Sequence, residues 1–374
     1  MIKAKKVRLL PTKEQEEMFF KCSNIARFSY NYSLGLRIRY YKMFKKTISE
    51  QRLRKHITKR KKTKLKFLSE VSNDIPKQAV KDMNLAFKNF FQKGNKGFPK
   101  FKSKRKSKLS FYNDVCKLKI EDNNIIQLAK IGKVKTSEQL PINTKFTNPR
   151  ISYDGKYWYI SIGIEVDENQ VGLNKDLVIG VDLGLKNLAI CSDNSVFKNI
   201  NKTHKVRKTE KRLKRLQRKV SRKYDMNKQG NKYLKTKNIL KLEKEIKLIH
   251  RKLTNIRNNH LHQTTNSIIK KYPCKIVMED LNVGGMMKNI YLSKAVANQG
   301  FFEFTRQMEY KCKFNGIEFV KVDRFYPSSK KCSQCGSIKK NLKLSDRIYK
   351  CECGLEIDRD LNASINLANY EKLA

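Results

Sequence analysis

Two closely spaced pairs of cysteines near the C-terminus constrain the fold of this chain more than any other feature of its sequence. The first pair lies in KCSQCG and the second in CECG, with fifteen residues between the pairs. The four residues are Cys332, Cys335, Cys351 and Cys353. Four thiolates in a tetrahedron at roughly 2.3 Å satisfy Zn²⁺ completely, and Gly336 and Gly354 permit the tight turns that such a site needs. The spacing predicts one structural zinc ion, around which residues 326–355 fold as a zinc ribbon.

The second pair is C-x-C rather than the commoner C-x-x-C, which leaves the ligand geometry open. A site with three sulfurs and a weaker fourth ligand is one alternative, and a reduced loop without metal is another. The other five of the nine cysteines are scattered, so one metal site in a reducing compartment fits better than a disulfide framework. The charged N-terminal segment and the lack of a long apolar run predict neither a secretory signal nor a membrane span.

The charge balance predicts a polyanionic partner. The 374 residues include 84 Lys and Arg against 34 Asp and Glu, a formal net charge of +50. Self-repulsion of that size strains a compact fold, and bound phosphates would relieve it. Nucleic acid is the obvious counter-charge, and its affinity should fall steeply with salt because binding releases counterions. A solvated basic surface without a partner is the simpler alternative.

Hydrophobic periodicity divides the chain into two parts of different character. Residues 1–10 read as a strand, 12–47 as one or two amphipathic helices and 75–91 as a further helix. Residues 109–170 alternate as short strands, and Asp154-Gly155 is a strong hairpin signal. We expect a small antiparallel barrel or sandwich here, which strand 1–10 can join. Beyond it, strands and helices alternate, including one helix over about 296–314, and this predicts a mixed α/β sheet.

Two basic segments are candidate nucleic-acid contacts. Residues 97–108, GFPKFKSKRKSK, interleave two phenylalanines with lysines, which suits phosphate contact together with base or sugar packing. In residues 201–260, 22 side chains are Lys or Arg against four acids, and apolar residues at helical spacing predict an antiparallel helical hairpin. The candidate contacts are Lys100, Lys102, Lys104, Arg105, Arg212, Arg215 and Arg218. Solvated basic faces are the alternative for both segments.

Two apolar strands carry acids. In VIGVDLG, alternation places Gly180 and Asp182 on one face, and the glycines leave room for something large to approach. An acid in such a run costs several kcal/mol unless it is paired or metal-bound. KIVMED ends on Glu279 and Asp280, either of which could point inward, and we favour Glu279. A salt-bridged core acid is the simpler explanation.

A third pair of acids, Asp358 and Asp360, stands at the start of a helix that begins near Leu361. One of them can cap the helix while the other faces the sheet, although a plain cap explains both. Three converging carboxylates suit two Mg²⁺ ions about 3.5–4 Å apart that clamp a scissile phosphate. The sequence offers no rival catalytic set, since the five histidines lie in basic helical regions and no phosphate-binding loop or nucleophile elbow occurs.

The chain resembles the TnpB (OrfB) proteins of insertion sequences in three ordered segments, GVDLG, IVMEDLNV and YPSSKKCSQCG followed by YKCECGLEIDRDLNASINL. These proteins are RNA-guided DNA endonucleases related to type V CRISPR effectors. The likeness spans nearly the whole chain, because VRLLPTKEQEEMF and KQAVKDMNLAFKNFFQKGNKGFPKFKSK are similar to the family's N-terminal part. It implies a RuvC-like nuclease of the RNase H fold with the carboxylates Asp182, Glu279 and Asp360, and for this reason we choose Asp360 over Asp358.

The resemblance also implies an α+β multidomain architecture. Residues 1–11 and 105–170 would form a wedge-like β-barrel, with a helical recognition domain of residues 12–104 inserted. Residues 171–325 and 356–374 would form the nuclease domain, which includes the basic helical hairpin 201–260 and the inserted zinc ribbon 326–355.

The implied cofactors are two Mg²⁺ per active site and one structural Zn²⁺. The implied partners are a transposon-derived guide RNA and target double-stranded DNA, whose sequence is read by base pairing beside a short motif. Lys77 and Gln78 would face that motif. We expect a monomer in the cytoplasm of a prokaryotic cell, associated with the nucleoid and not with a membrane.

Two other functions remain open. A catalytically inactive relative would bind RNA and DNA as a regulator, and a transposase would join DNA ends through the same three acids. A purely structural basic protein is disfavoured by the acids in apolar strands and by the cysteine cluster.

Overall fold

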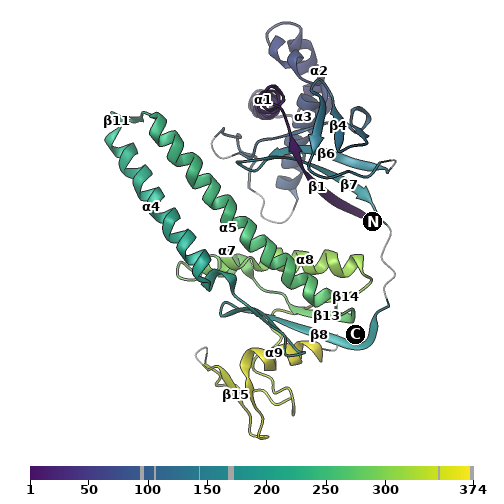
Figure 1. Ribbon diagram of the computed structural model, residues 1–374, viewed down its shortest axis with the longest axis vertical. Coiled ribbons are helices and arrows are strands. Elements are labelled where there is room, and N and C mark those ends of the chain that lie inside the picture. The colour runs from purple at the N-terminus through teal and green to yellow at the C-terminus, as the bar shows by residue number, and fades with distance from the viewer. Residues whose placement is uncertain (93–96, 105–106, 143, 167–171, 344–345, 371–374) are drawn as a thin grey trace. The chain divides into compact units, whose positions relative to one another are not determined.

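The computed structural model describes residues 1–92, 97–104, 107–142, 144–166, 172–343 and 346–370. The chain separates into two units, Met1–Val166 and Asp167–Ala374 (Figure 1). Each unit has its own main sheet and its own buried apolar cluster. None of the helices in the described residues combines the length and the apolar character that a membrane crossing requires.

A seven-stranded antiparallel sheet underlies the first unit, in the order β2-β6-β7-β1-β5-β4-β3. The strands are β1 (Ile2–Leu10), β2 (Ser110–Tyr112), β3 (Lys119–Glu121), β4 (Ile125–Leu128), β5 (Gly132–Thr136), β6 (Phe146–Tyr153) and β7 (Trp158–Glu165). β1 pairs with β7 from Ile2↔Glu165 to Leu9↔Trp158, so the predicted N-terminal strand joins this sheet. The expected hairpin connects β6 to β7, and Gly155 in its turn has φ +100°, which glycine adopts without strain.

Three helices pack with this sheet: α1 (Lys13–Phe44), α2 (Glu50–Lys61) and α3 (Asp74–Phe91). Two short 3₁₀ turns lie at Lys66–Glu70 and Val115–Lys117. α1 is a single helix with a capping box, in which the Thr12 hydroxyl accepts from the Gln15 N–H and the Gln15 side chain accepts from the Thr12 N–H. Trp158 is 1% exposed and packs edge-on against Phe19 and Phe20, which anchors α1 on the sheet.

A five-stranded mixed sheet organises the second unit, in the order β10-β9-β8-β13-β14. The strands are β8 (Asn174–Leu183), β9 (Asn187–Cys191), β10 (Val196–Lys198), β13 (Pro273–Glu279) and β14 (Glu318–Val322). β8, β9 and β10 are antiparallel neighbours, whereas β13 runs parallel to both β8 and β14. The predicted mixed α/β sheet is confirmed.

Helices cover both faces of this sheet (Figure 1). α5 (Lys237–Ile269) and α8 (Phe301–Phe314) pack on one face, in the cluster that contains Ile179 and Val181. α9 (Arg359–Ala368) packs on the other face through Leu367. The prediction of a single helix over 296–314 is wrong, because the structure has two helices there. α7 (Ser293–Gln299) ends before Gly300, whose φ of +74° separates it from α8.

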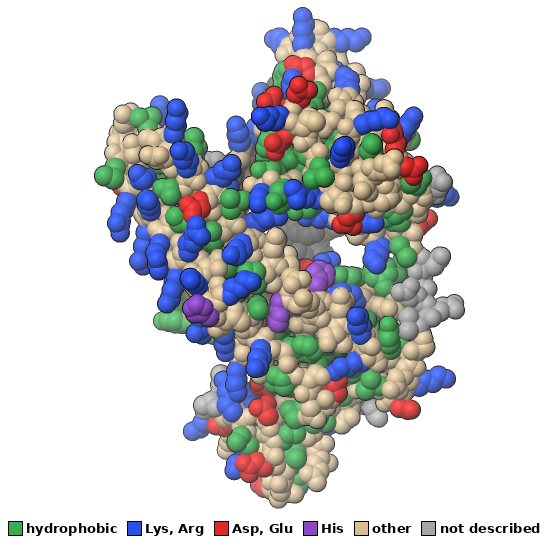
Figure 2. Space-filling model, viewed as in Figure 1, with side chains coloured by type: hydrophobic (Ala, Val, Ile, Leu, Met, Phe, Trp, Pro, Cys, Tyr) green, Lys and Arg blue, Asp and Glu red, His purple; other side chains and the backbone are tan. Residues whose placement is uncertain are grey.

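α5 extends from the sheet to pair with α4 (His204–Met226), as the predicted helical hairpin. A small two-stranded turn, β11 (Lys228–Gln229) with β12 (Lys232–Tyr233), connects the two helices. Val206, Leu213, Ile249 and Leu253 form the buried seam between them. Lys and Arg side chains cover the outer faces, as Figure 2 shows. The 3₁₀ turn Ile200–Lys202 leads into α4, and the short helix α6 (Val283–Met286) follows β13.

Strand β8 and helix α9 lie very close together at Gly180. A Cβ atom there would lie 2.0 Å from the carbonyl oxygen of Ser364 and 2.5 Å from the backbone nitrogen of Ala368. Because both colliding atoms belong to the backbone, neither could rotate away as a side chain does. The sequence suggests that this glycine makes room for an approaching group, and in the structure that group is α9 itself.

We predict that Gly180→Ala lowers the free energy of unfolding by about 3 kcal/mol or more, because overpacking usually costs about 1–3 kcal/mol and here the neighbouring backbone must move. Urea or thermal unfolding of the full chain measures the loss. Gly97→Ala is the matched control, since its Cβ would meet nothing within 4 Å. Equal stability of the two variants would contradict the close packing of α9 on β8.

Candidate metal centres of the second unit

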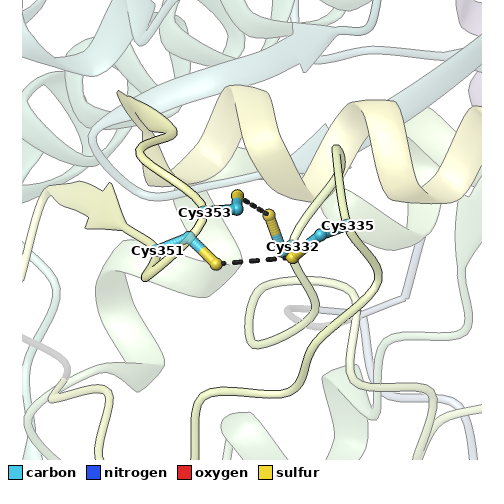
Figure 3. A group of neighbouring side chains, drawn as sticks. All are labelled: Cys332, Cys335, Cys351 and Cys353. Atoms are coloured by element: carbon cyan, nitrogen blue, oxygen red, sulfur yellow. Dashed lines mark hydrogen bonds between the residues drawn. The ribbon is translucent and has the colours of Figure 1, made fainter.

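The four predicted cysteines come together in the structure (Figure 3). Their sulfur atoms all lie within 4.8 Å of one another. Cys332 Sγ is 3.7 Å from Cys353 Sγ, and Cys335 Sγ is 3.6 Å from Cys351 Sγ. Four sulfurs at 2.3 Å from a central ion would be about 3.8 Å apart, so the cluster has the size of a tetrahedral zinc site. Cys353 belongs to it despite the C-x-C spacing, and the cluster can hold one zinc ion.

Two tight turns present these sulfurs. In each turn, the glycine after the cysteine pair donates its N–H to the carbonyl of the pair's first cysteine, at 3.0 Å for Gly336 and 3.1 Å for Gly354. Their φ angles of +77° and +90° are ones that glycine adopts without strain. The second turn connects strands β15 (Ile348–Lys350) and β16 (Glu356–Asp358), which pair antiparallel. A small hairpin therefore carries the C-x-C pair.

Ser337, which the sequence analysis missed, lies against the sulfurs. Its Oγ is 3.1 Å from Cys335 Sγ and 3.2 Å from Cys351 Sγ. A hydroxyl that donates to a thiolate favours the charged form, and this contact is the main reason why the pKa of Cys351 is lowered to about 6. The pKa of Cys353 is raised to about 12, because burial and the neighbouring sulfurs together outweigh the Leu355 N–H, which acts to lower it. Thiols packed in this way share protons until a cation replaces those protons.

Two buried asparagines of α9, also missed from the sequence, connect the cysteine segment to that helix. Asn362 Nδ2 donates to the Lys331 carbonyl at 2.7 Å, and the Ser333 N–H donates to Asn362 Oδ1 at 3.0 Å. Asn366 Nδ2 donates to the carbonyls of Lys331 and Ser328 at 2.6 and 2.8 Å. In the sequence, two asparagines four residues apart on an otherwise apolar helix face could have indicated this contact. The start of α9 and the first cysteine pair are thus held together.

Asp182 and Glu279 lie at the ends of neighbouring parallel strands. The last registered pair of β8 and β13 is Val181↔Met278, and the two acids follow it directly. Because side chains alternate along a strand, Asp182 shares the face of Gly180, against which α9 packs. Glu279 shares the face of Val277, whose buried side chain packs in the cluster that contains Leu367 of α9. Both acids are therefore directed to the α9 side of the sheet.

Asp280, the other acid that the sequence left open, has a different environment. Its carboxylate forms an ion pair with Arg324 at 3.3 Å, and both side chains are about half exposed. The pKa of Glu279, by contrast, is raised by burial and by the adjacent charge of Asp280. The geometry favours Glu279 as the acid on the side of Asp182.

The two acids at the start of α9 divide their roles. The Asp358 carboxylate accepts from the N–H groups of Asp360 at 2.9 Å and of Leu361 at 3.2 Å, so Asp358 is the helix cap. The helix begins at Arg359, two residues before the predicted start. Asp360 lies in its first turn and acts on Asp182 through its charge.

The pKa of Asp182 is raised to about 7, first by burial and then by the negative charges of Asp360 and Glu279. Arg359 and the Leu183 N–H act in the opposite direction. The three carboxylates therefore share one electrostatic environment, although they come from distant parts of the chain. Among the residues that the structure describes, the four cysteines are the group whose ligand atoms lie within reach of a single ion.

The predicted nucleic-acid contacts lie in both units. Arg212, Arg215 and Arg218 are exposed on α4, and Arg212 also pairs with Glu245 at 2.5 Å. In the first unit, Lys77, Lys100 and Lys104 are exposed, whereas Gln78 and Lys102 are partly buried. Arg105 lies outside the described residues.

Phe98, which the sequence suggests for base or sugar packing, already contacts other aromatic rings. It packs edge-on against Phe87 and Phe90 of α3. About half of its surface remains exposed. Phe98 therefore helps to hold the basic segment against α3.

We predict that the purified protein contains about one zinc ion per chain and that Cys353→Ser weakens zinc retention at least tenfold, because a fourth thiolate completes the tetrahedron. Competition with a chromophoric chelator measures retention. Zinc should also be released as the pH falls through about 6, since protons compete for the sulfurs. Cys116→Ser, which changes an exposed cysteine outside the cluster, is the control. Equal retention by both variants would exclude Cys353 as a ligand.

We predict that Asp182→Asn stabilises the Mg²⁺-free protein above pH 7. The folded-state pKa of about 7 exceeds the ordinary 3.8, so the folded state holds this proton more tightly than the unfolded state. The wild type therefore loses stability as the pH rises from about 4 to about 7, and the variant does not. The gain should reach roughly 2–4 kcal/mol, where the lower end allows for the solvent that reaches a partly exposed side chain.

Chemical unfolding at several pH values, with zinc retained, measures this difference. Adding Mg²⁺ should stabilise the wild type and leave Asp182→Asn nearly unchanged, because only the wild type has an ionisable carboxylate at this position. A variant that is less stable than the wild type at pH 8 without Mg²⁺ would contradict the repulsion inferred among the three acids.

Three family models match the chain. A helix-turn-helix domain matches residues 1–46, a probable transposase (OrfB of the IS605 type) matches residues 161–290, and the TNB domain of Cas12f1-like proteins matches residues 301–367. The second range contains Asp182 and Glu279, and the third contains the four cysteines and Asp360.

Known proteins resemble the chain over nearly its full length. One from Streptomyces pristinaespiralis, named "Putative RNA-guided DNA endonuclease", is 32% identical over 370 residues, which cover 98% of this chain and 88% of that protein. InsQ of Escherichia coli K12, which bears the same description, is 28% identical, and the alignment covers 98% of this chain and 91% of that protein. A solved Cas12f1–sgRNA–target DNA complex shares the fold, with a TM-score of 0.59 at 15% identity over 96% of this chain and 84% of that one. The chain belongs to the TnpB (OrfB) family of insertion-sequence proteins.

Proposed function

We propose that this protein is an RNA-guided, Mg²⁺-dependent DNA endonuclease of an insertion sequence. The observation that supports the proposal is the pKa of Asp182, which is raised to about 7 by burial and then by the negative charges of Asp360 and Glu279. Anions gathered in this way cost free energy unless a cation neutralises them. The names of the two full-length relatives support the same activity.

In this proposal the second unit is a RuvC-like nuclease domain of the RNase H fold, with an inserted zinc ribbon. Adjoining ends of β8 and β13 supply Asp182 and Glu279, and α9 supplies Asp360 from the far end of the chain. The bonds from Asn362 and Asn366 to the cysteine segment give zinc an indirect role. A metal-bound ribbon would hold the start of α9, and with it Asp360, in place.

The donor set fits magnesium, which prefers hard oxygen ligands. Asp182, Glu279 and Asp360 would hold two Mg²⁺ ions, whose chemistry is to activate the attacking water and to stabilise the leaving oxygen of the phosphodiester. Asp182 must release its proton before it can bind a cation, so metal binding should strengthen as the pH rises through about 7. Asp358 positions Asp360 by capping its helix.

The cationic surfaces would hold nucleic acid by its backbone. α4 alone carries eleven Lys and Arg against two acids. The first unit would combine the wedge-like barrel with the recognition helices, while guide RNA reads the target by base pairing. Lys77 is exposed on α3 and free to meet the motif beside the target. Gln78 donates to Asp82 at 3.0 Å and would have to exchange that bond to read a base.

We predict that Asp182→Asn, Glu279→Gln and Asp360→Asn each reduce plasmid cleavage at least about 100-fold while the copurified RNA stays bound, because each removes a metal ligand and not a phosphate contact. The assay uses protein purified with its own RNA, a matching plasmid target and Mg²⁺. Asp280→Asn is the matched control. It removes the carboxylate next to Glu279 in the sequence, and because that carboxylate pairs with Arg324, the variant should cut at nearly the wild-type rate. Equal loss in Glu279→Gln and Asp280→Asn would refute the assignment of Glu279.

The two rival functions give different outcomes in this assay. A catalytically inactive regulator binds RNA and DNA, but its wild type cuts no better than Asp182→Asn. A strand-transfer protein produces end-joined DNA instead of nicked or linear plasmid. RNA that copurifies with the wild type, once sequenced, identifies the guide and therefore the target to be tested.

A further inference from the structure

Phe325 is the most exposed large apolar side chain among the described residues, with 88% of its surface open to solvent. A single exposed apolar residue is common and needs no explanation by itself. The position of this one sets it apart. Val322, at the end of β14 shortly before Phe325, is the registered partner of Glu279. The ring is therefore displayed at the edge of the sheet that carries Asp182 and Glu279.

Contacts on both sides hold the turn that presents Phe325. Its N–H donates to the Asp323 carboxylate at 2.8 Å, and the Tyr326 N–H donates to the Asp323 carbonyl at 3.1 Å. The Tyr326 ring packs edge-on against Tyr370, and its hydroxyl donates to the carbonyl of Asn366 in α9 at 3.2 Å. The backbone of the turn is thus fixed without any contact of the Phe325 ring. A binding group that is held in place beforehand has a smaller ordering cost.

An open pocket of about 390 Å³ lies beside this turn, where β13 and β14 end. Ligand pockets usually measure roughly 300–1,000 Å³. The described lining includes Lys321 and Arg324 against Asp280 and Asp323, so its charges balance. Such a pocket attracts a bare phosphate only weakly. Its exposed ring suits a flat, uncharged group instead.

We propose that Phe325 stacks on an unpaired base of the DNA strand that reaches the three carboxylates. Every base offers a flat face, so an aromatic ring can hold a strand by stacking without reading its sequence. Within a duplex both faces of a base are covered by its neighbours, and only an unpaired base can meet the ring. One stacked base fixes where the adjoining phosphodiester lies relative to Asp182, Glu279 and Asp360.

This inference rests on the proposed function, because it takes DNA as the substrate and the carboxylates as the catalytic site. It adds to them a residue that binds the substrate and is not a metal ligand. Its first test measures binding without Mg²⁺ and is therefore independent of cleavage.

The first test places a fluorescent ring at position 325. Phe325→Trp is compared with Phe302→Trp, since Phe302 is 71% exposed on α8, which covers the other face of the sheet. The wild type gives the baseline, because the single natural tryptophan, Trp158, is buried in the first unit. The protein is loaded with its own RNA and titrated with matching target DNA.

The emission of Phe325→Trp should fall as DNA binds, because a stacked base quenches an indole ring, whereas that of Phe302→Trp should stay constant. Equal changes in the two variants overturn the proposal. Quenching by RNA alone, with no further change when DNA is added, also overturns it, because the ring would then meet the guide and not the target.

The second test measures cleavage in Mg²⁺. Phe325→Ala should cut about 5- to 150-fold more slowly than the wild type, the loss expected when one base gives up its stacking partner. Phe325→Tyr keeps the ring and should retain most of the rate, and Phe302→Ala should cut normally. The melting temperature of Phe325→Ala should be nearly unchanged, because the side chain it removes is exposed.

Substrates with one abasic nucleotide at successive positions around the cut then identify the stacked base. At one position the abasic substrate should slow the wild type by about the same factor as Phe325→Ala, and should not slow Phe325→Ala further. Losses that multiply at every position, or no loss in Phe325→Ala, overturn the proposal. A wild type that does not cut refutes the endonuclease, and the fluorescence titration still decides whether a DNA base meets the ring.

Discussion

Helix α9 lies so close to strand β8 that position 180 has room for a hydrogen atom but not for a methyl group. This contact determines where the C-terminal part of the chain sits on the mixed sheet. The buried Leu367 packs there with Val277 and Val322, and the first turn of α9 brings Asp360 to the side of Asp182. The proposed catalytic centre thus depends on backbone packing that involves no charged group.

The same helix couples the cysteine cluster to the carboxylates. Asn362 and Asn366 are almost completely buried, and both bond to the carbonyl of Lys331, directly before the first cysteine. A buried amide that loses its partner is costly, so the helix and the turn can separate only at a substantial free-energy cost. Zinc bound at the sulfurs would therefore stabilise more than its own small hairpin. It would also restrict the start of the helix on which Asp360 lies.

Acids are scarce in this chain, and the structure uses several of them to hold cations in place. Asp82 fixes Arg150 in the first unit, and Glu210 of α4 pairs with Arg257 of α5 at 2.7 Å within the helical hairpin. With 34 acids against 84 cations, most Lys and Arg side chains cannot find such a partner within the protein. Much of the excess lies on exposed helix faces such as that of α4, where water and salt screen it.

Local pattern was sufficient for the elements and for the ligand types. Alternation and helical spacing predicted β1, the β6–β7 hairpin, the α4–α5 hairpin and the four clustered cysteines, since each depends on neighbours in the sequence or on a strong side-chain chemistry. The sequence analysis did not predict the helix break at Gly300, because a left-handed glycine inside a helical pattern does not interrupt its periodicity. It also did not predict the contacts of Ser337, because a hydroxyl that meets a distant thiol leaves no pattern in the sequence. The roles of the three acids stay a proposal that the geometry supports.

The sequence by itself determined that the chain is a basic member of its family with a four-cysteine cluster and with acids at strand and helix ends. Only the tertiary structure decided which acid at the end of β13 lies on the α9 side, that Gly180 accommodates a helix, and that Ser23 Oγ and Arg27 Nε are buried without a hydrogen-bond partner. The reason is physical: residue type and spacing set local conformation and ligand chemistry. Burial, close approach and unsatisfied hydrogen bonds arise only when segments distant in the chain pack together.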